Sequence, residues 1–500
     1  MMLETLDCTS LEALADKLGV VSKGTPAPIL VGKLANISWS WGSTKTCIFC
    51  EHFGIADVVD SYVMLAASGD DQDEAVSSVF GRPLDDPFYE LHTFQSDIRD
   101  RVLNQFIVHG EQKLLLQLPT GGGKTRVALH TAIRYLRAHE GDRVGILWLA
   151  YDPLLLSQAA ATFQKLWPVL GVGDIEVRRI FDIYRDPIHC SGPVIYFASV
   201  QSLTNRFDVA TRQHLKESLL ITVFDEAHQI VANQAKEIIN NLLYHNDELR
   251  LLGLTATPGR DYFDDEANVQ FRKYFSTNIK IEPPPKVASF GAVDVVADDD
   301  RTAITYLQEL GVLAQLEHRL LDYGMSDQRG HSVSITQDCY RPAALKKLGE
   351  DPSRNRHIVD EVDKLVAQGK KTLVFACSVQ HAEDLSFFLR LRGINVGLVL
   401  GNNREHRSAT INRFRKTQDL HVLINFGVLT TGFDAPEIDA VVISRPTSSL
   451  VTYSQMLGRA LRGPMNGGHV RNLVVNVSDP IFGKENEAYK KFETYWRDYA

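Results

Sequence analysis

Three features that would narrow the class of protein are missing from this 500-residue sequence. It contains no apolar run of the roughly 20 residues that a membrane-spanning helix needs. Its first residues are acidic and lack the pattern of a signal peptide. Its six cysteines are scattered apart from one pair, which argues against a disulfide framework. We therefore expect a cytoplasmic protein whose thiols are reduced.

An excess of positive charge is also lacking. The formal net charge is −9 at pH 7, which argues against a protein that coats nucleic acid over its whole surface. A local basic groove is compatible with this balance, because a protein that moves along a strand needs positive charge only along its track. Hydrophobic residues make up 44% of the chain, enough for a sizeable core, and the length predicts about two to four domains.

The most informative segment is a glycine-rich loop that follows an apolar run ending at Leu118. After the loop, apolar residues recur at helical spacing, so the segment reads as strand, glycine loop and helix. Glycines let backbone N–H groups approach an anion, and a helix N-terminus adds partial positive charge. We expect Lys124 to reach the β- and γ-phosphates and the Thr125 hydroxyl to bind Mg²⁺. The residues predicted to hold the phosphates are Thr120, Gly121, Gly122, Gly123, Lys124 and Thr125.

The strict phosphate-loop pattern would place a glycine where Leu118 stands. The alternative interpretation of the segment is therefore a glycine-rich turn with a lysine in it. The downstream motifs decide between the two.

Apolar strands alternate with helical segments on both sides of the chain's midpoint, which predicts parallel βαβ units. Residues 303–321 are expected to form a helix, because Leu313, Leu316 and Leu320 share one helical face. An amphipathic helix is expected at 485–499. The predicted strands are 114–118, 144–150, 194–200, 219–224 and 249–254, then 372–376, 396–400, 422–426, 440–444 and 473–477.

One predicted strand ends in two carboxylates, in the sequence Asp225-Glu-Ala-His228. The carboxyl ends of strands are where α/β sheets place their ligands. Asp225 is expected to hold Mg²⁺ and Glu226 to polarise the attacking water, which is the chemistry of phosphoanhydride hydrolysis. A lone Asp-Glu pair usually marks a solvated surface, but this pair ends a mostly apolar run.

Together with Thr255-Ala-Thr257, this motif resembles the superfamily 2 helicases of the DEAD/DEAH type. The most similar branch is the one like type III restriction subunits, which includes the RadD-like repair helicases. Residues 197–203 resemble motif Ib of that family. Phe94-Gln95 resembles its adenine-reading aromatic–glutamine pair, although His92 lies near where an arginine often precedes that pair.

The second half of the chain carries the family's remaining motifs. Residues 374–378 resemble motif IV, 426–436 resemble motif V, and 455–462 match the Q-x-x-G-R-x-x-R pattern of motif VI. Arg459 and Arg462 are three residues apart, so we expect them to share one helix face and to meet the γ-phosphate from the opposite lobe. The resemblance adds further roles: catalysis for Gln455, nucleotide binding for Gly432 and Asp434, and coupling or nucleic-acid contact for Gln201, His228, Thr255, Thr257, Thr430 and Thr431.

The resemblance implies an α/β fold of two tandem RecA-like lobes behind a small accessory module. We place the module at 1–88, the ATP-binding lobe at 89–283, a connecting segment at 284–350 and the second lobe at 351–500. Within the module, the spacing of Cys47 and Cys50 matches half of a zinc site, for which Cys8 and His52 are the candidate partners. We favour two unligated cysteines, because no second pair follows nearby.

The leading hypothesis is therefore a helicase or translocase that uses ATP and Mg²⁺ to move along or unwind nucleic acid, DNA rather than RNA. Such a protein would hold the strand mostly through its phosphates. The alternative is an ATP-driven motor or switch that does not separate strands. It would serve a larger complex in DNA repair, restriction or antiviral defence, with protein partners at 1–88. A structural protein with an inactive nucleotide site is the third interpretation, and no membrane partner is expected.

Overall fold

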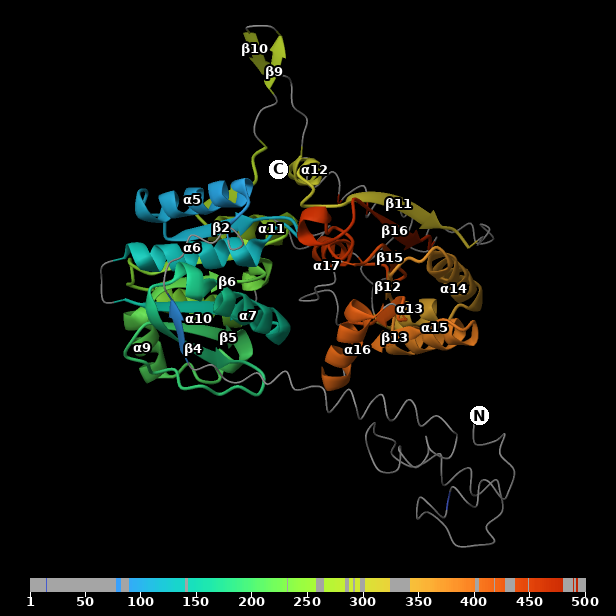
Figure 1. Cartoon of the computed structure of the whole chain (residues 1–500). Helices are drawn as coiled ribbons and strands as arrows, with labels where there is room; N and C mark the ends of the chain where they lie inside the picture. Colours follow the sequence, from blue (N-terminus) through green and yellow to red (C-terminus); the bar gives the residue numbers. More distant parts are fainter. Residues whose placement is uncertain are drawn as a thin grey trace. The chain divides into compact units, whose positions relative to one another are not determined.

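A computed structural model provides the structure of the protein (Figure 1). Residues 75–402 and 410–500 form one unit, to which both large sheets belong, and residues 1–74 with 403–409 form another. No helix within the described ranges is long and apolar enough to cross a membrane. The structure describes residues 90–139, 143–231, 233–257, 265–283, 302–323, 342–400, 404–417, 419–427, 437–447 and 449–479, with Ala15, 78–81, 287–290, 293–296, Tyr489 and Phe492.

The first sheet has eight strands in the order β1-β4-β5-β3-β6-β7-β2-β8. All neighbouring pairs are parallel except β1 with β4. The strand order brings β2, β7 and β6 side by side, so the loops after these three strands meet at one edge. The strands are β1 (Ser78–Gly81), β2 (Lys113–Gln117), β3 (Gly145–Ala150), β4 (Gly173–Ile180), β5 (Val194–Ser199), β6 (Leu219–Phe224), β7 (Arg250–Thr255) and β8 (Thr277–Lys280).

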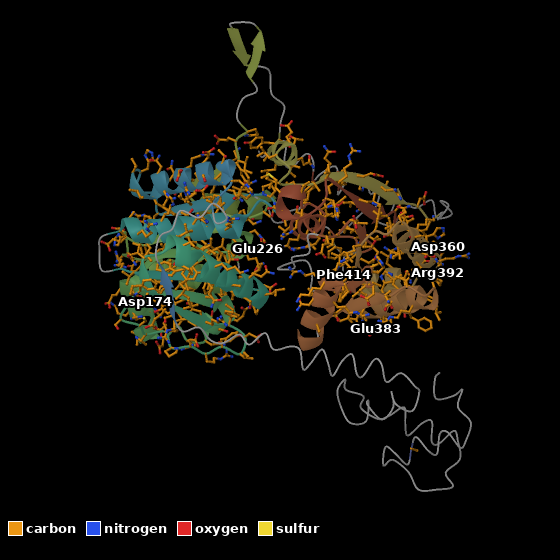
Figure 2. The ribbon with its side chains drawn as sticks, in the orientation of Figure 1. Asp174, Glu226, Asp360, Glu383, Arg392 and Phe414 are labelled. Carbon is orange, nitrogen blue, oxygen red and sulfur yellow. The ribbon has the colours of Figure 1, made fainter. Side chains whose placement is uncertain are left out.

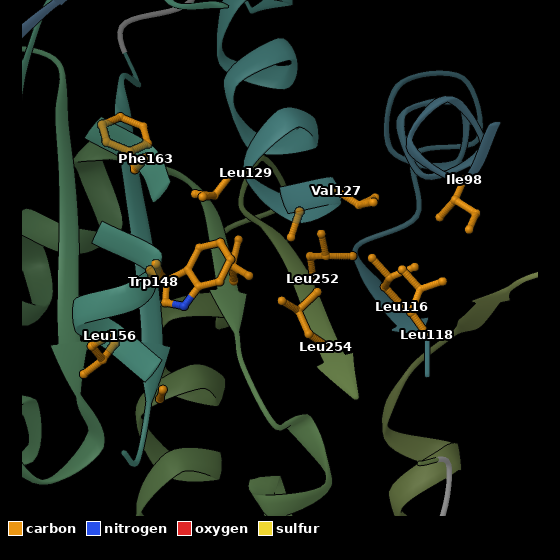
Figure 3. Close-up of a cluster of buried hydrophobic side chains, with 14 of the residues drawn as sticks. Ile98, Leu116, Leu118, Val127, Leu129, Trp148, Leu156, Phe163, Leu252 and Leu254 are labelled. Carbon is orange, nitrogen blue, oxygen red and sulfur yellow. The ribbon is translucent and has the colours of Figure 1, made fainter. Parts of the chain in front are cut away.

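Helices cover both faces of this sheet. The central strands carry apolar side chains on both faces, and packing against helices removes those side chains from water. One face packs against α5 (Thr93–Ile107), α6 (Lys124–Ala138) and α7 (Pro153–Leu170). Figure 3 shows that apolar layer, in which Trp148 and Leu116 lie among side chains from these helices. The opposite face packs against α8 (Val200–Thr204), α9 (Val209–Ser218), α10 (Asn233–Leu243) and α11 (Asp265–Tyr274).

The second sheet has six parallel strands in the order β11-β16-β15-β12-β14-β13. A separate antiparallel pair, β9 (Val287–Phe290) with β10 (Val293–Val296), lies between the two sheets in the chain. The strands are β11 (Gln315–Leu321), β12 (Thr372–Phe375), β13 (Val396–Val399), β14 (Val422–Asn425), β15 (Ala440–Ile443) and β16 (Arg471–Val477). The helices are α12 (Ala303–Glu309), α13 (Pro342–Gly349), α14 (Pro352–Ala367), α15 (Val379–Leu391), α16 (Arg404–Lys416) and α17 (Leu450–Leu457).

The predicted α/β class and all ten predicted strands are confirmed within a residue or two at each end. The predicted helix at 303–321 is confirmed over its first seven residues and wrong beyond them. Helix α12 ends at Glu309, Gly311 turns the chain with a φ of 70°, and Gln315–Leu321 forms an edge strand of the second sheet. The leucine spacing was misleading, because this segment is held by pairing with β16, more than 150 residues away. The helix expected at 485–499 lies mostly outside the described residues.

Candidate nucleotide site

Three polar loops meet at the carboxyl edge of the first sheet. β7 lies between β2 and β6, so the glycine loop after β2 and the carboxylates after β6 flank the threonines after β7. Backbone hydrogen bonds extend the pairing past the strand ends, from Leu118 N to Thr255 O at 3.1 Å and from Asp225 N to Leu149 O at 2.9 Å. These bonds fix where the loops begin.

The glycine loop adopts a conformation that other residues would strain. Gly121 and Gly123 have φ values of 89° and 85°, in the left-handed region that favours glycine. Gly123 is the N-cap of α6, whose first residues are Lys124 and Thr125. The loop therefore presents backbone N–H groups, a helix N-terminus and a lysine together, as an anion site requires.

Gln95 fastens the start of α5 to this loop. Its Nε2 donates to Gly122 O at 3.0 Å, and its Oε1 accepts from His92 N at 3.1 Å. A Cβ added to Gly123 would lie only 2.3 Å from Gln95 Nε2.

Phe94, which was predicted to contact adenine together with Gln95, is only 5% exposed and belongs to the hydrophobic core beside the first sheet. The half-buried His92 ring lies parallel to that of Phe94, with centroids 6.0 Å apart. Adenine contact by Phe94 and Gln95 stays a prediction.

The lysine and the two carboxylates interact electrostatically. Burial lowers the pKa of Lys124, while the charges of Glu226 and Asp225 counter that effect. Burial and the neighbouring Glu226 raise the pKa of Asp225 to about 7. Lys124 Nζ lies 3.3 Å from Leu118 O, at the entrance to the loop.

Glu226, labelled in Figure 2, has an unusual backbone conformation for a residue other than glycine. Its φ is 52°, in a turn where its N–H donates to Asp225 Oδ1 at 3.0 Å. Burial alone would raise the pKa of Glu226. The nearby His228, whose Nδ1 lies 3.3 Å from Glu226 Oε2, acts with Lys124 and Arg459 to outweigh burial and leaves that pKa below its usual range.

The threonines after β7 face inward. Thr255 and Thr257 are 0% and 1% exposed, and Thr255 Oγ1 both accepts from Thr257 N at 3.1 Å and donates to Thr257 O at 2.6 Å. Such burial suits a role in coupling better than direct contact with a strand. Gln201 is exposed on α8, after β5, where it can meet a ligand. The coupling and nucleic-acid roles of these residues stay predictions.

The motif VI arginines follow a helix instead of sharing its face, so that part of the prediction is wrong. Helix α17 carries the buried Gln455 and ends at Leu457 with Gly458 as its C-cap. Beyond it, Arg462 pairs with Leu313 in an antiparallel bridge. That pairing pulls the chain out of helical geometry. The charge of Arg459 still acts on Lys124 and Glu226, lowering the pKa of each.

Several predicted site residues lie outside the described part of the chain. They are Gly432 and Asp434 for the nucleotide, Thr430 and Thr431 for coupling, and Cys47 and Cys50 for zinc. Their roles stay predictions. Sequence reasoning missed Asn466, in the turn after motif VI, whose amide Nδ2 lies 3.3 Å from Gly121 O. Glycines on both sides of Asn466 signalled a turn but gave no hint of its partner.

The residues present fit a magnesium ion. Asp225 is a buried carboxylate whose ionised form is disfavoured by burial and by Glu226, so a nearby cation would stabilise it. Its oxygens and the Thr125 hydroxyl are the hard ligands that Mg²⁺ takes alongside phosphate and water. No group of three or more His, Cys, Asp or Glu residues able to hold a metal is found in the described ranges. Mg²⁺ itself uses one or two carboxylates plus the substrate's phosphates.

The chain forms two mainly parallel sheets in tandem, and in the first sheet a glycine loop of the phosphate-binding type follows β2. These features define an α/β protein of two RecA-like lobes. Residues 88–260 match the family model described as type III restriction enzyme, res subunit, and residues 354–464 match the helicase conserved C-terminal domain. The chain belongs to the superfamily 2 helicases, an ATP-dependent family that generally uses Mg²⁺, and it carries a first lobe of the restriction-subunit type.

Curated relatives are similar over about three quarters of this chain. A putative ATP-dependent helicase of Saccharomyces cerevisiae, IRC3, is 27% identical over 381 residues, covering 74% of this chain and 49% of the relative. The type I restriction enzyme EcoKI endonuclease subunit of Escherichia coli is 25% identical, covering 74% of this chain and 33% of the relative. The chain thus spans half or less of the length of these two relatives.

Solved structures share the fold at low identity. A fragment of a putative HsdR subunit of a type I restriction enzyme from Vibrio vulnificus aligns with a TM-score of 0.55 and 19% identity, over 96% of this chain and 79% of the other. The helicase MrfA bound to DNA aligns with a TM-score of 0.56 and 14% identity, over 87% and 58%. At such identities the likeness concerns the fold.

Proposed function

We propose that this protein hydrolyses ATP between its two lobes to move along or unwind DNA. The observation that carries this proposal is a contact: the turn after the motif VI arginines lies against the glycine loop, with Asn466 Nδ2 3.3 Å from Gly121 O. Lys124, Glu226 and Arg459 also interact electrostatically, a loop lysine, a candidate base and an arginine of the second-lobe motif.

The chain's own residues account for hydrolysis. The glycine loop and Lys124 bind the β- and γ-phosphates, and Asp225 with Thr125 holds Mg²⁺, which would neutralise phosphate charge. Glu226, whose pKa is held below its usual range, accepts a proton from water as the water oxygen bonds to the γ-phosphorus and the bond to ADP breaks. Arg459 stabilises the charge that develops on the transferred group.

DNA is favoured over RNA as the track. The matching first-lobe family is described by a restriction subunit, and relatives named for restriction and DNA helicase activity support the same choice. A relative from Methanocaldococcus jannaschii, 23% identical over 478 residues that cover 77% of this chain and 58% of that protein, is a putative RNA helicase, so RNA is the competing track.

Steady-state ATP hydrolysis by the purified chain tests this proposal, alone and with single-stranded DNA, duplex DNA or single-stranded RNA. DNA should stimulate turnover strongly, and RNA weakly. Equal or greater stimulation by RNA would reverse the choice of track, and no stimulation by any polymer would remove the motor function.

The alternative is a motor or switch that does not separate strands, acting inside a DNA repair, restriction or antiviral defence complex. The alignment of an HsdR fragment along 96% of this chain favours it, because HsdR is named as a subunit. An assay that measures displacement of a labelled strand from a tailed duplex distinguishes the helicase from the motor that does not separate strands. ATP-dependent release favours the helicase, whereas DNA-stimulated hydrolysis without release favours the alternative.

A further inference from the structure

The turn that follows the second-lobe arginines is bonded to two other segments through one side chain. Asn466 ends a short turn, Pro464–Asn466, after motif VI. Its Nδ2 lies 3.0 Å from Val312 O in the segment before β11, and 3.3 Å from Gly121 O in the glycine loop. A side-chain amide nitrogen has two hydrogens to donate, so one Asn466 can serve both carbonyls.

The arginine segment and the segment before β11 form a single hydrogen-bonded piece. Arg462 pairs with Leu313, and Ala314 N donates to Leu461 O at 2.9 Å. Gly463 N donates to Val312 O at 3.0 Å. A Cβ on Gly463 would lie 2.3 Å from Gly311 O, so the two backbones are in tight contact. A shift of Asn466 would therefore be passed to the arginines.

The same piece packs directly on the glycine loop. A Cβ on Gly458 would lie 2.3 Å from Thr120 Cγ2, and a Cβ on Gly121 would lie 3.1 Å from Leu313 Cδ2. Contacts of this kind are nondirectional, so they hold the surfaces together without fixing the loop's peptide planes. The Asn466 bond adds direction, because it depends on where the Gly121 carbonyl points.

We propose that Asn466 is a positioning residue that transmits the conformation of the glycine loop to Arg459 and Arg462. This inference rests on the proposed ATPase function. Gly121 belongs to the loop predicted to receive the phosphates, and the peptide after it is also held by a bond from Gly122 N to Pro119 O at 2.9 Å. In this proposal, filling of the loop by nucleotide shifts that peptide, whose carbonyl Asn466 holds. The amide then carries that change to the arginine segment, and the arginines reach their working positions only when the loop is correctly filled.

Two substitutions of Asn466 test this role. Asn466→Asp keeps the size but removes the donor and sets a carboxylate against two carbonyl oxygens, while Asn466→Ser is milder. Met465→Ala is the matched control, because Met465 belongs to the same turn and is 54% exposed. We expect both Asn466 variants to bind the fluorescent analogue mant-ATP within about threefold of wild type. Their kcat with DNA should fall about tenfold or more, since small misplacements of catalytic groups are costly.

The midpoint of thermal unfolding and the affinity for mant-ATP distinguish a positioning role of Asn466 from a merely structural one. If Asn466 positions the arginines, both Asn466 variants should unfold at the wild-type temperature and bind ATP normally, with the loss confined to kcat. It is overturned if Asn466→Ser matches Met465→Ala in kcat, or if ATP affinity falls while kcat at saturation is unchanged. It is also overturned if kcat per folded molecule is normal in a destabilised Asn466→Asp. Lys124→Ala is run beside them, because wild-type turnover in that variant would refute the proposed function itself.

Discussion

His228 Nδ1 lies 3.3 Å from Glu226 Oε2, in a turn where Glu226 holds a φ of 52°. A left-handed backbone costs a residue other than glycine roughly 1–2 kcal/mol. Such strain collects at functional sites, where the surrounding structure over-determines it. Here it places the Glu226 carboxylate, whose pKa His228 helps to lower, along the edge that also carries the glycine loop. We therefore expect the protonation of Glu226 to depend in part on His228.

Replacing His228 tests this dependence. In His228→Ala the pKa of Glu226 should rise, since burial then acts against its charge with less opposition. A base works only when deprotonated, so the acid limb of the kcat/KM profile should move to higher pH, with the largest loss of activity under acid conditions. His357→Ala, at a half-buried histidine of α14, serves as control. An unshifted acid limb would contradict the assignment of His228.

Replacing Glu226 tests the base itself. Glu226→Gln keeps the shape but cannot accept a proton, so kcat should fall by about 10²–10⁴-fold. ATP affinity should stay near that of wild type, because the phosphates are held by the loop and Lys124. Filter binding of labelled ATP and phosphate release are the two measurements. Normal turnover in Glu226→Gln would mean that another group activates the water.

Replacing Gln95 tests how the loop is held. Gln95→Ala removes the bonds to Gly122 O and His92 N, and losing a buried hydrogen bond costs about 1–3 kcal/mol, so mant-ATP affinity should weaken roughly tenfold. Gln112→Ala is a matched control. It also removes a glutamine–carbonyl bond, to Asn246 O at 2.8 Å, but just before the opposite end of β2. Equal affinities in the two variants would show that Gln95 does not shape the loop.

We expect His381 to make the second sheet less stable in acid. Its Nδ1 accepts from Cys377 N at 3.0 Å, and burial, with the charge of Arg354, lowers the pKa of His381 to about 3. Unfolding restores a pKa near 6.5, so the unfolded state binds the proton first. The contribution of neutral His381 to the free energy of unfolding is therefore fully present above pH 6.5. Between pH 6.5 and the folded pKa, this contribution falls by about 1.4 kcal/mol for each pH unit.

The informative change at this position is His381→Asn, because the new side chain places an amide oxygen where Nδ1 lies but does not titrate. Hydrogen exchange of peptides covering β12 (Thr372–Phe375), corrected for intrinsic rates, measures the local stability. In the wild-type protein, the protection of β12 from exchange should drop between neutral pH and pH about 5. In His381→Asn, the protection of β12 should drop less over the same range. Parallel loss in both proteins would mean that other groups cause the acid sensitivity.

Local patterns explain what the sequence could predict. Two parts of the site depend only on residues that are adjacent in the chain, so the sequence predicts both. They are the strand, glycine loop and helix around Lys124 and the carboxylates after β6. Strand β4 was missed although Ile175 and Val177 alternate with more exposed residues, a signal that was available. The family resemblance supplied Arg459 and Arg462, which no local pattern would have distinguished from a solvated basic face.

Long-range pairing explains what the sequence could not predict. Leu316 and Leu320 fit a helical face, but their segment pairs with β16 along all seven residues. The same pairing region turns Arg462 away from helix α17 toward Leu313. Asn466 gained its role from a carbonyl 345 positions earlier in the chain. Such partners become apparent only once the strands and turns are placed.

Single-turnover hydrolysis of γ-labelled ATP with DNA present tests most directly whether both lobes act on one nucleotide. Wild type, Lys124→Ala and Arg459→Ala are compared, each with its measured ATP affinity. Lys124→Ala should fail to bind. Arg459→Ala should bind ATP normally but hydrolyse it about 10³-fold or more slowly, as expected for an arginine that stabilises the transferred phosphoryl group. Wild-type hydrolysis by Arg459→Ala would contradict the account, because ATP would then be cleaved by the first lobe alone.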